Sequence, residues 1–235
     1  MLPLKALHTN SLNRILFFKA GTLIGVPAYF FVAHFLLIFF KTPDIPPTAS
    51  QEPYRLSAEE TALLKEGDII MRRGHGFVSS VINELFQTGY NLSHCAFVAE
   101  ENGRPMVIHT VSSELSGVDG MQMESLEKFV EESVRGTILA VRLKKAAGEA
   151  ALPVMYARQF LARRIPFDDK FDLADTTKLY CTELIYLSYL KAFKKDLFTS
   201  RFQTDHPNFL SLSALLDTTL FEVVINHQAA PLPAL

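Results

Sequence analysis

The sequence predicts an α+β domain that follows one N-terminal transmembrane helix. The mixed class rests on two kinds of segment: short runs rich in β-branched and aromatic residues, and longer stretches whose apolar residues recur with the helical period. The transmembrane helix rests on residues 20–40, which contain no Asp, Glu, Lys or Arg. The chain of 235 residues is long enough for one domain with a hydrophobic core.

The uncharged span is long enough to cross a bilayer, since a helix of its length rises roughly 30 Å. A cleaved signal peptide is the alternative, but the apolar part of a signal peptide covers only about 7–15 residues. Lys5, Arg14 and Lys19 precede the span, and no acidic residue does. The positive-inside rule therefore predicts that residues 1–19 are a short cytoplasmic tail. In a bacterium this would make the chain a single-pass inner-membrane protein whose domain faces the periplasm.

Residues 41–65 are predicted to form a tether that ends in a short helix. Four prolines fall between residues 42 and 53 and favour an extended chain. The helix is expected over residues 56–65, with Ser57 as its N-cap and Glu60 three residues later, the pattern of a capping box. The folded domain is then expected over residues 66–228, followed by a tail at residues 229–235.

Short apolar runs within the domain predict strands at residues 67–72, 94–99, 105–110, 137–143 and 221–225. Glu101-Asn102-Gly103 supplies a turn, so the second and third of these strands are expected to form a hairpin.

Apolar side chains at helical spacing predict helices at residues 76–87 and 148–164, the second of which ends before Pro166. Shorter helices are expected at residues 125–132, behind Ser125, and at residues 209–216. A polar, acidic loop at residues 166–177 leads into a helix at residues 178–194, whose lysines suit its C-terminal end.

Charge and motif content exclude several classes of function. The 23 basic residues are balanced by 25 acidic residues, a net charge of −2, which indicates no surface for nucleic acid. The sequence contains no phosphate-binding glycine motif and no Cys-x-x-Cys pair. No metal or organic cofactor is therefore predicted.

Cys181 is the strongest candidate for a catalytic residue because it falls where an apolar helical pattern begins. The N-terminus of a helix favours a thiolate, which is the nucleophilic form of cysteine. His94, on the strand at residues 94–99, can take the thiol proton and later give it to a leaving group. A thiol and an imidazole of this kind are the minimal set of a thiol hydrolase.

Cys95 allows another interpretation, in which Cys95 and Cys181 form a disulfide in an oxidising compartment. Neighbouring residues of a strand point to opposite faces, so if His94 faces Cys181, Cys95 is expected to face away as a small buried residue. A zinc site of His94, His109 and a cysteine is a further alternative, but no fourth ligand is visible. Three further histidines have no matched partner and are interpreted as structural or surface residues: His75, His206 and His227.

The sequence carries a series of short motifs: Gly67-Asp68-Ile69-Ile70, Ser93-His94, Val107-Ile108-His109, Pro166-Phe167-Asp168 and Tyr180-Cys181-Thr182-Glu183-Leu184. In this order they resemble the circularly permuted, papain-like branch of the NlpC superfamily, and most of all its YiiX/YebB-like cysteine hydrolases. The resemblance implies a small antiparallel sheet or half-barrel packed on the helix that carries the cysteine. It implies Cys181 as the nucleophile and His94 as the base, the reverse of the order in ordinary papain-like enzymes.

The third residue of this group, which orients the histidine, is often a glutamate, whereas His109 stands at that position here. An imidazole can still hydrogen-bond to His94, but it lacks the carboxylate charge that stabilises an imidazolium. A second imidazole at this place is similar to the lecithin-retinol acyltransferase-like enzymes, which act on the acyl chains of lipids. Their thiol lies in an Asn-Cys-Glu-His-like string, which the residues around Cys181 do not match.

These observations predict a membrane-anchored thiol hydrolase that cleaves an amide or peptide bond, with cell-wall material as the substrate class suggested by family and topology. A lipid acyl hydrolase or acyltransferase and a catalytically silent binding module are the alternatives. Ser93, Tyr180 and Asp168 are candidate substrate-binding residues. The competing interpretations are a turn hydrogen bond for Ser93, packing against the sheet for Tyr180 and capping of the loop for Asp168.

Overall fold

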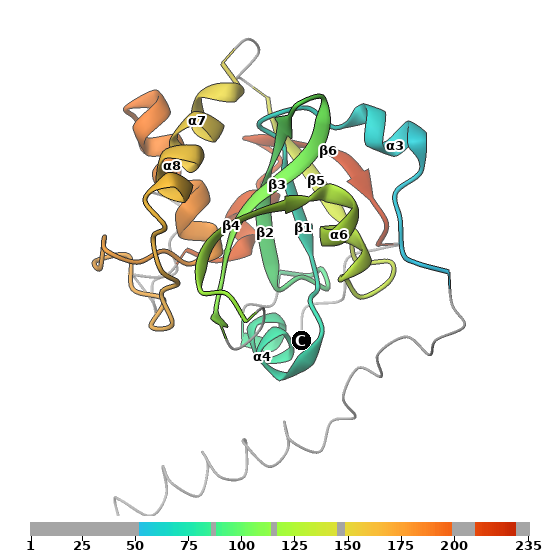
Figure 1. Cartoon of the computed structure of the whole chain (residues 1–235), viewed down its shortest axis with the longest axis horizontal. Helices are drawn as coiled ribbons and strands as arrows, with labels where there is room; N and C mark the ends of the chain where they lie inside the picture. Colours follow the sequence, from blue (N-terminus) through green and yellow to red (C-terminus); the bar gives the residue numbers. More distant parts are fainter. Residues whose placement is uncertain (1–51, 86–87, 114–116, 145–148, 199–209, 229–235) are drawn as a thin grey trace, which may run out of the picture. The chain divides into compact units, whose positions relative to one another are not determined.

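The computed structural model describes residues 52–85, 88–113, 117–144, 149–198 and 210–228. These residues form an antiparallel, six-stranded sheet in the order β4-β3-β2-β1-β5-β6 (Figure 1). Its strands are β1 (Ile69–Arg72), β2 (His94–Glu101), β3 (Arg104–Val111), β4 (Gly120–Ser125), β5 (Leu139–Leu143) and β6 (Phe221–Asn226). The predicted α+β class is confirmed.

The hairpin of β2 and β3 forms because its turn residues accept the required backbone. Asn102 and Gly103 have φ angles of 53° and 72°. A two-residue hairpin loop with positive φ at both positions matches the right-handed twist of the strands it joins. The predicted hairpin is therefore confirmed, and it fixes the register of Phe97 opposite Ile108.

The strand β4 was not predicted, because only a short helix was expected in that part of the chain. Its sequence alternates Met121 and Met123, which pack on the main core, with Gln122 and Glu124 on the opposite face. This alternation is the sequence signal for the strand. Because Gln122 pairs with His109, β4 extends the sheet beside the third candidate catalytic residue.

Helices cover the two faces of the sheet unequally (Figure 1). The main core lies between the sheet and the helices α7 (Ala151–Ala162) and α8 (Cys181–Phe193), together with the 3-10 helix η2 (Leu212–Leu216). The opposite face is covered by the short helix α6 (Leu126–Glu131), whose Phe129 is fully buried. Strand β2 contributes alternate residues to the two cores: Cys95 and Phe97 to the first, Ala96 and Val98 to the second.

The local helix signals are confirmed. In α3 (Ala58–Leu63), the backbone N–H of Glu60 donates to Ser57 Oγ at 3.1 Å, and the N–H of Ser57 donates to Glu60 Oε2 at 2.8 Å. Helix α4 (Gly76–Leu85) follows β1 as predicted. Helix α8 (Cys181–Phe193) forms where a helix was predicted but begins at Cys181 rather than at residue 178, and residues 212–216 form a 3-10 helix within the longer helix expected there.

The tail at residues 1–19, the span at residues 20–40 and most of the tether lie outside the described residues, as does the tail at residues 229–235. Among the described residues, no helix combines the length and apolar character needed to cross a membrane.

Candidate active site

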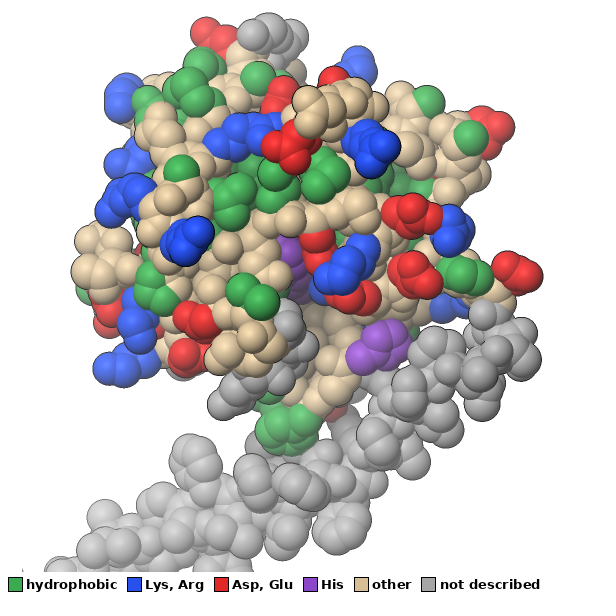
Figure 2. All heavy atoms as spheres, in the orientation of Figure 1, with side chains coloured by type: hydrophobic (Ala, Val, Ile, Leu, Met, Phe, Trp, Pro, Cys, Tyr) green, Lys and Arg blue, Asp and Glu red, His purple; other side chains and the backbone are tan. Residues whose placement is uncertain are grey.

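A cavity of about 910 Å³ opens where β1 ends and β2 begins. Figure 2 shows a histidine recessed in a hollow that acidic and basic side chains border. Cys181, His94 and His109 all line this cavity, so the fold brings together the three predicted catalytic residues. Ser93 also lines the cavity, and its Oγ accepts a hydrogen bond from the N–H of Gly74 at 3.0 Å.

The position of Cys181 follows from the way α8 starts. Tyr180 has extended backbone angles, φ −98° and ψ 171°, and its N–H donates to Glu183 Oε2 at 3.3 Å. Leu184 and Ile185 follow, and both are fully buried against the sheet. The helix therefore begins at Cys181, which lines the cavity, and the backbone N–H groups of its first turn have no partner within the helix.

The surroundings of the Cys181 sulfur favour the thiolate. The sulfur accepts hydrogen bonds from the Cys95 thiol and from the backbone N–H groups of Cys95, Thr182 and Cys181 itself. The Cys95 thiol and these N–H groups lower the pKa of Cys181, although burial opposes them. Burial raises the pKa of Cys95 well above its ordinary value, so Cys95 keeps its proton and acts as the donor.

The expectation that Cys95 faces away from Cys181 is wrong. The N–H of Val98 donates to Asp68 O on the β1 side, so the N–H of Cys95, three residues earlier, points to the β3 side. On that side the pairing between β2 and β3 ends at Phe97, so β3 offers no acceptor to the N–H of Cys95. This N–H donates to the Cys181 sulfur at the N-terminus of α8 instead.

The Cys181 sulfur therefore lies beside β2 at the point where two strands part, in contact with Cys95 and also bordering the cavity. Both cysteines are free thiols in this structure, so the predicted alternative of a disulfide is not the state described here.

His94 and His109 form a hydrogen-bonded pair. His94 Nε2 lies 2.9 Å from His109 Nδ1, and the two rings meet edge to face. His94 is half-buried, whereas His109 is 2% exposed. Because Nε2 of His94 is taken, Nδ1 is the nitrogen left for the thiol. No hydrogen bond joins His94 to Cys181 in the described part of the chain, and such bonds often tighten only when substrate binds.

Both imidazoles are held neutral. Burial, together with His109 and Arg72, keeps the pKa of His94 well below its ordinary value. Burial, together with Arg72 and Lys128, lowers the pKa of His109 to about 3. A neutral His94 is in the form that can accept a proton, but the imidazolium that results needs a nearby negative charge to stabilise it.

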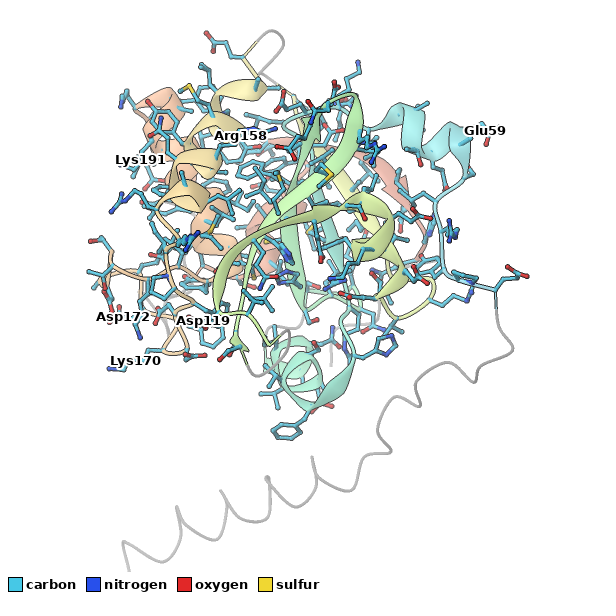
Figure 3. All side chains as sticks on the ribbon, viewed as in Figure 1. Glu59, Asp119, Arg158, Lys170, Asp172 and Lys191 are labelled. Carbon is cyan, nitrogen blue, oxygen red and sulfur yellow. The ribbon has the colours of Figure 1, made fainter. Side chains whose placement is uncertain are left out.

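The structure places the other two predicted substrate-binding residues in the interior, away from the cavity lining. Tyr180 is 1% exposed, and its phenol oxygen accepts the N–H of Leu210 at 3.0 Å. Asp168 is fully buried and accepts the N–H groups of Lys170 and Asp172 at 3.0 and 2.6 Å. These contacts are the packing and capping roles that competed with substrate binding. Lys170 and Asp172 themselves lie on the outside of the loop (Figure 3).

Sequence reasoning missed the charged residues around the histidines. Arg72 places its guanidinium 4.1 Å from the centre of the Phe129 ring. Glu124 Oε1 lies 3.5 Å from His109 Nε2, and Glu124 Oε2 lies 2.5 Å from Lys128 Nζ. The missed strand β4 carries Glu124, so the alternating pattern that identifies β4 would also have placed this carboxylate on the histidine face.

A family model described as a permuted papain-like amidase enzyme, YaeF/YiiX, C92 family, matches residues 63–207. This chain belongs to the C92 family. The resemblance to permuted papain-like hydrolases is thereby confirmed, and a thiol-type amide hydrolase is established at the level of the family.

A solved structure has a similar fold to this C92 chain. The metalloprotein YiiX from Escherichia coli O157:H7 matches with a TM-score of 0.55 and 18% identity, over 70% of this chain and 98% of that chain. No curated protein matches this chain.

The Escherichia coli protein is described as a metalloprotein. In the C92 chain described here, no three His, Cys, Asp or Glu side chains of the described ranges are arranged to hold a metal ion. His94 Nε2 and His109 Nδ1 bond to each other, so these two nitrogens do not present a shared site. Within the ranges that the structure describes, the side chains that line the cavity therefore do not fit a metal centre.

Proposed function

We propose that this C92 protein is a membrane-anchored thiol hydrolase that cleaves an amide bond, with Cys181 as the nucleophile and His94 as the base. One observation carries the proposal: the Cys181 sulfur, in the wall of a cavity that His94 also lines, accepts hydrogen bonds from two N–H groups at the start of α8 and from the N–H of Cys95 on β2. Donors of this kind stabilise a thiolate. The family description, a papain-like amidase, supports an amide as the bond that is cleaved.

The proposed reaction proceeds through a covalent thioester. The Cys181 sulfur attacks the carbonyl carbon while His94 Nδ1 takes the thiol proton. Once the sulfur has bonded to the carbonyl carbon and lost its negative charge, the N–H of Cys181 is free to stabilise the oxyanion, because an amide at a helix start has no partner within the helix. The C–N bond then breaks, and His94 returns the proton to the leaving amine. Water, deprotonated by His94, attacks the thioester and releases the acid and the free thiol.

The substrate class we propose is a peptide or other amide of bacterial cell-wall material. The support for it is the uncharged span at residues 20–40 with only basic charges before it, which favours a domain on the periplasmic side of the inner membrane. A lipid acyl chain is the second candidate. It is favoured by the second imidazole, His109, and by the apolar side chains of Val78 and Ile82 on the cavity wall.

Trapping of the acyl-enzyme tests the proposal. The full-length protein is incubated with a bacterial envelope extract, and the peptide that contains Cys181 is analysed by mass spectrometry. An adduct on Cys181 is expected, its mass identifies the acyl group, and Cys181→Ala is expected to lose both the adduct and turnover while it stays folded. Hydrolysis of muropeptides against phospholipid vesicles then separates the two substrate classes.

An adduct on Cys95 in place of Cys181 would contradict the assignment of the nucleophile. Binding of a substrate without any adduct or hydrolysis would indicate a silent binding module.

A further inference from the structure

We infer that Glu124 is a positioning residue of this site: its carboxylate fixes the tautomer of His109 and, through His109, leaves Nδ1 of His94 free to take the Cys181 proton. The inference rests on the proposed function, because it concerns the base of that reaction. It also supplies the carboxylate that the sequence lacks at the position of His109.

The residues involved form a row across the sheet. Arg72, His94, His109 and Glu124 come from β1, β2, β3 and β4, which are neighbours in that order. Arg72 pairs with His94 in the ladder, and His109 contacts both His94 and Glu124. All four side chains lie on the face of the sheet that Phe129 covers.

The hydrogen bonds that link His94, His109 and Glu124 can run in two directions, and only one of them leaves His94 Nδ1 able to accept a proton. If His94 Nδ1 is to accept the thiol proton, the hydrogen of neutral His94 must be on Nε2. His94 Nε2–H then donates to His109 Nδ1, at 2.9 Å. His109 must therefore carry its own hydrogen on Nε2, and that N–H points toward an acceptor. Glu124 Oε1 is that acceptor, at 3.5 Å.

The two atoms that end this chain, His109 Nε2 and Glu124 Oε1, have no other partner in the part of the protein that the structure describes. Among the described residues, His109 Nε2 and Glu124 Oε1 are both buried and neither makes a hydrogen bond. A buried polar atom without a partner costs about 1–3 kcal/mol, so a shift of roughly half an ångström that joins these two atoms is favoured. Lys128 Nζ holds the other oxygen, Oε2, at 2.5 Å and so turns Oε1 toward the histidine.

The charge balance also requires this carboxylate. A proton taken by His94 creates a cation close to the guanidinium of Arg72, and the ammonium of Lys128 adds a positive charge near its partner His109. Glu124 lies on β4, on the same face of the sheet as both histidines, and its carboxylate contacts both His109 and Lys128. Its negative charge compensates the imidazolium in the transition state, as the buried acid of a catalytic triad does.

Glu124→Gln is expected to exchange the donors and acceptors along this row of hydrogen bonds while it keeps a side chain of the same size. Because Lys128 Nζ can only donate, the amide oxygen of the new side chain is expected to face Lys128, which turns its NH₂ group toward His109. His109 Nε2 must then accept, His109 Nδ1 must donate to His94 Nε2, and the hydrogen of His94 moves to Nδ1. That tautomer cannot accept the thiol proton.

The tautomers are measured by long-range ¹H–¹⁵N correlation on the full-length protein with labelled histidine. The wild-type protein is expected to carry Nε2–H on both His94 and His109, and Glu124→Gln to carry Nδ1–H. In parallel, p-nitrophenyl acetate probes acylation of Cys181 across the pH range. Glu124→Gln is expected to slow acylation more than about tenfold at every pH without a change in substrate binding, and Glu124→Asp to retain more of the rate.

Glu127→Gln is the control, because Glu127 lies on the same helix as Lys128 but pairs with the exposed Arg55 and does not line the cavity. Its acylation rate is expected to stay within about twofold of wild type, as for a surface ion pair. Nδ1–H on His109 in the wild-type protein, or wild-type tautomers and rate in Glu124→Gln, would overturn the inference. If wild type and Cys181→Ala both fail to be acylated, the proposed function fails, while the tautomers still decide the role of Glu124.

Discussion

Replacing Glu183 with Gln is expected to change how the stability of this protein depends on pH. Glu183 is fully buried in the first turn of α8. Its Oε2 accepts the N–H of Tyr180, and its Oε1 has no hydrogen-bond partner among the described residues. Burial, together with the nearby charges of Asp168, Asp175 and Asp172, raises the pKa of Glu183 from 4.5 to about 8.

The size of the effect follows from proton linkage. Between pH 4.5 and about 8 the unfolded chain loses the proton of Glu183 while the folded protein keeps it. The unfolded state then binds fewer protons, so the free energy of unfolding falls as pH rises, by about 1.4 kcal/mol per pH unit for this one group. From pH 5 to pH 7 the loss is at most about 3 kcal/mol. Glutamine keeps an oxygen for the Tyr180 N–H and has no proton to lose.

Urea unfolding of both proteins at pH 5, 6, 7 and 8 measures this loss. The quantity to follow is the difference in free energy of unfolding between Glu183→Gln and wild type, because the other titrating groups cancel in it. This difference is expected to move in favour of the variant with each pH unit, up to about pH 8. A difference that stays constant within about 0.5 kcal/mol would show that Glu183 ionises in the folded protein, and would refute the reasoning.

Three further substitutions test the packing and the thiol. Gly120→Ala is expected to lower the free energy of unfolding by more than about 2 kcal/mol, because φ is +81° and the new Cβ would lie 2.3 Å from Ile165 O. Gly103→Ala, with φ +72° and open space, should cost only about 1 kcal/mol, and equal losses in urea unfolding would contradict the steric argument. Cys95→Ala removes a donor to the Cys181 sulfur, so the iodoacetamide rate of Cys181 should rise toward its plateau at higher pH than in wild type. An unshifted pH profile would show that the backbone N–H groups alone lower the pKa of Cys181.

Local signals were sufficient wherever a few neighbouring residues determine the structure. Ser57 and Glu60 satisfy each other's backbone N–H groups, and Asn102-Gly103 accepts the dihedral angles of a tight hairpin. The start of α8 at Cys181 is equally local, because it depends on the apolar residues that follow. The family motifs added the order in which the candidate catalytic residues follow one another along the chain: His94, His109 and then Cys181. The match to the C92 family confirms the resemblance.

Reasoning from alternation failed where the sheet departs from a regular ladder. Cys95 and His94 do point to opposite faces, but the Cys181 sulfur lies beside the strand, where β2 and β3 part, and so contacts Cys95 while it borders the cavity of His94. The alternation of residues within one strand does not indicate where its pairing with the neighbouring strand ends. Likewise, Tyr180 lies in a motif beside the nucleophile, yet its hydroxyl is used to anchor Leu210.

The sequence by itself determined the α+β class and the helix that carries Cys181, because helix caps, turns and periodicity are properties of consecutive residues. His94 was predicted from its place on a strand, and His109 from the resemblance to permuted papain-like hydrolases. Only the tertiary structure decided that Cys95 donates to Cys181 and that Glu124 faces His109. Both contacts join residues on different elements, and their formation depends on the register of the sheet and on the docking of α8 against it.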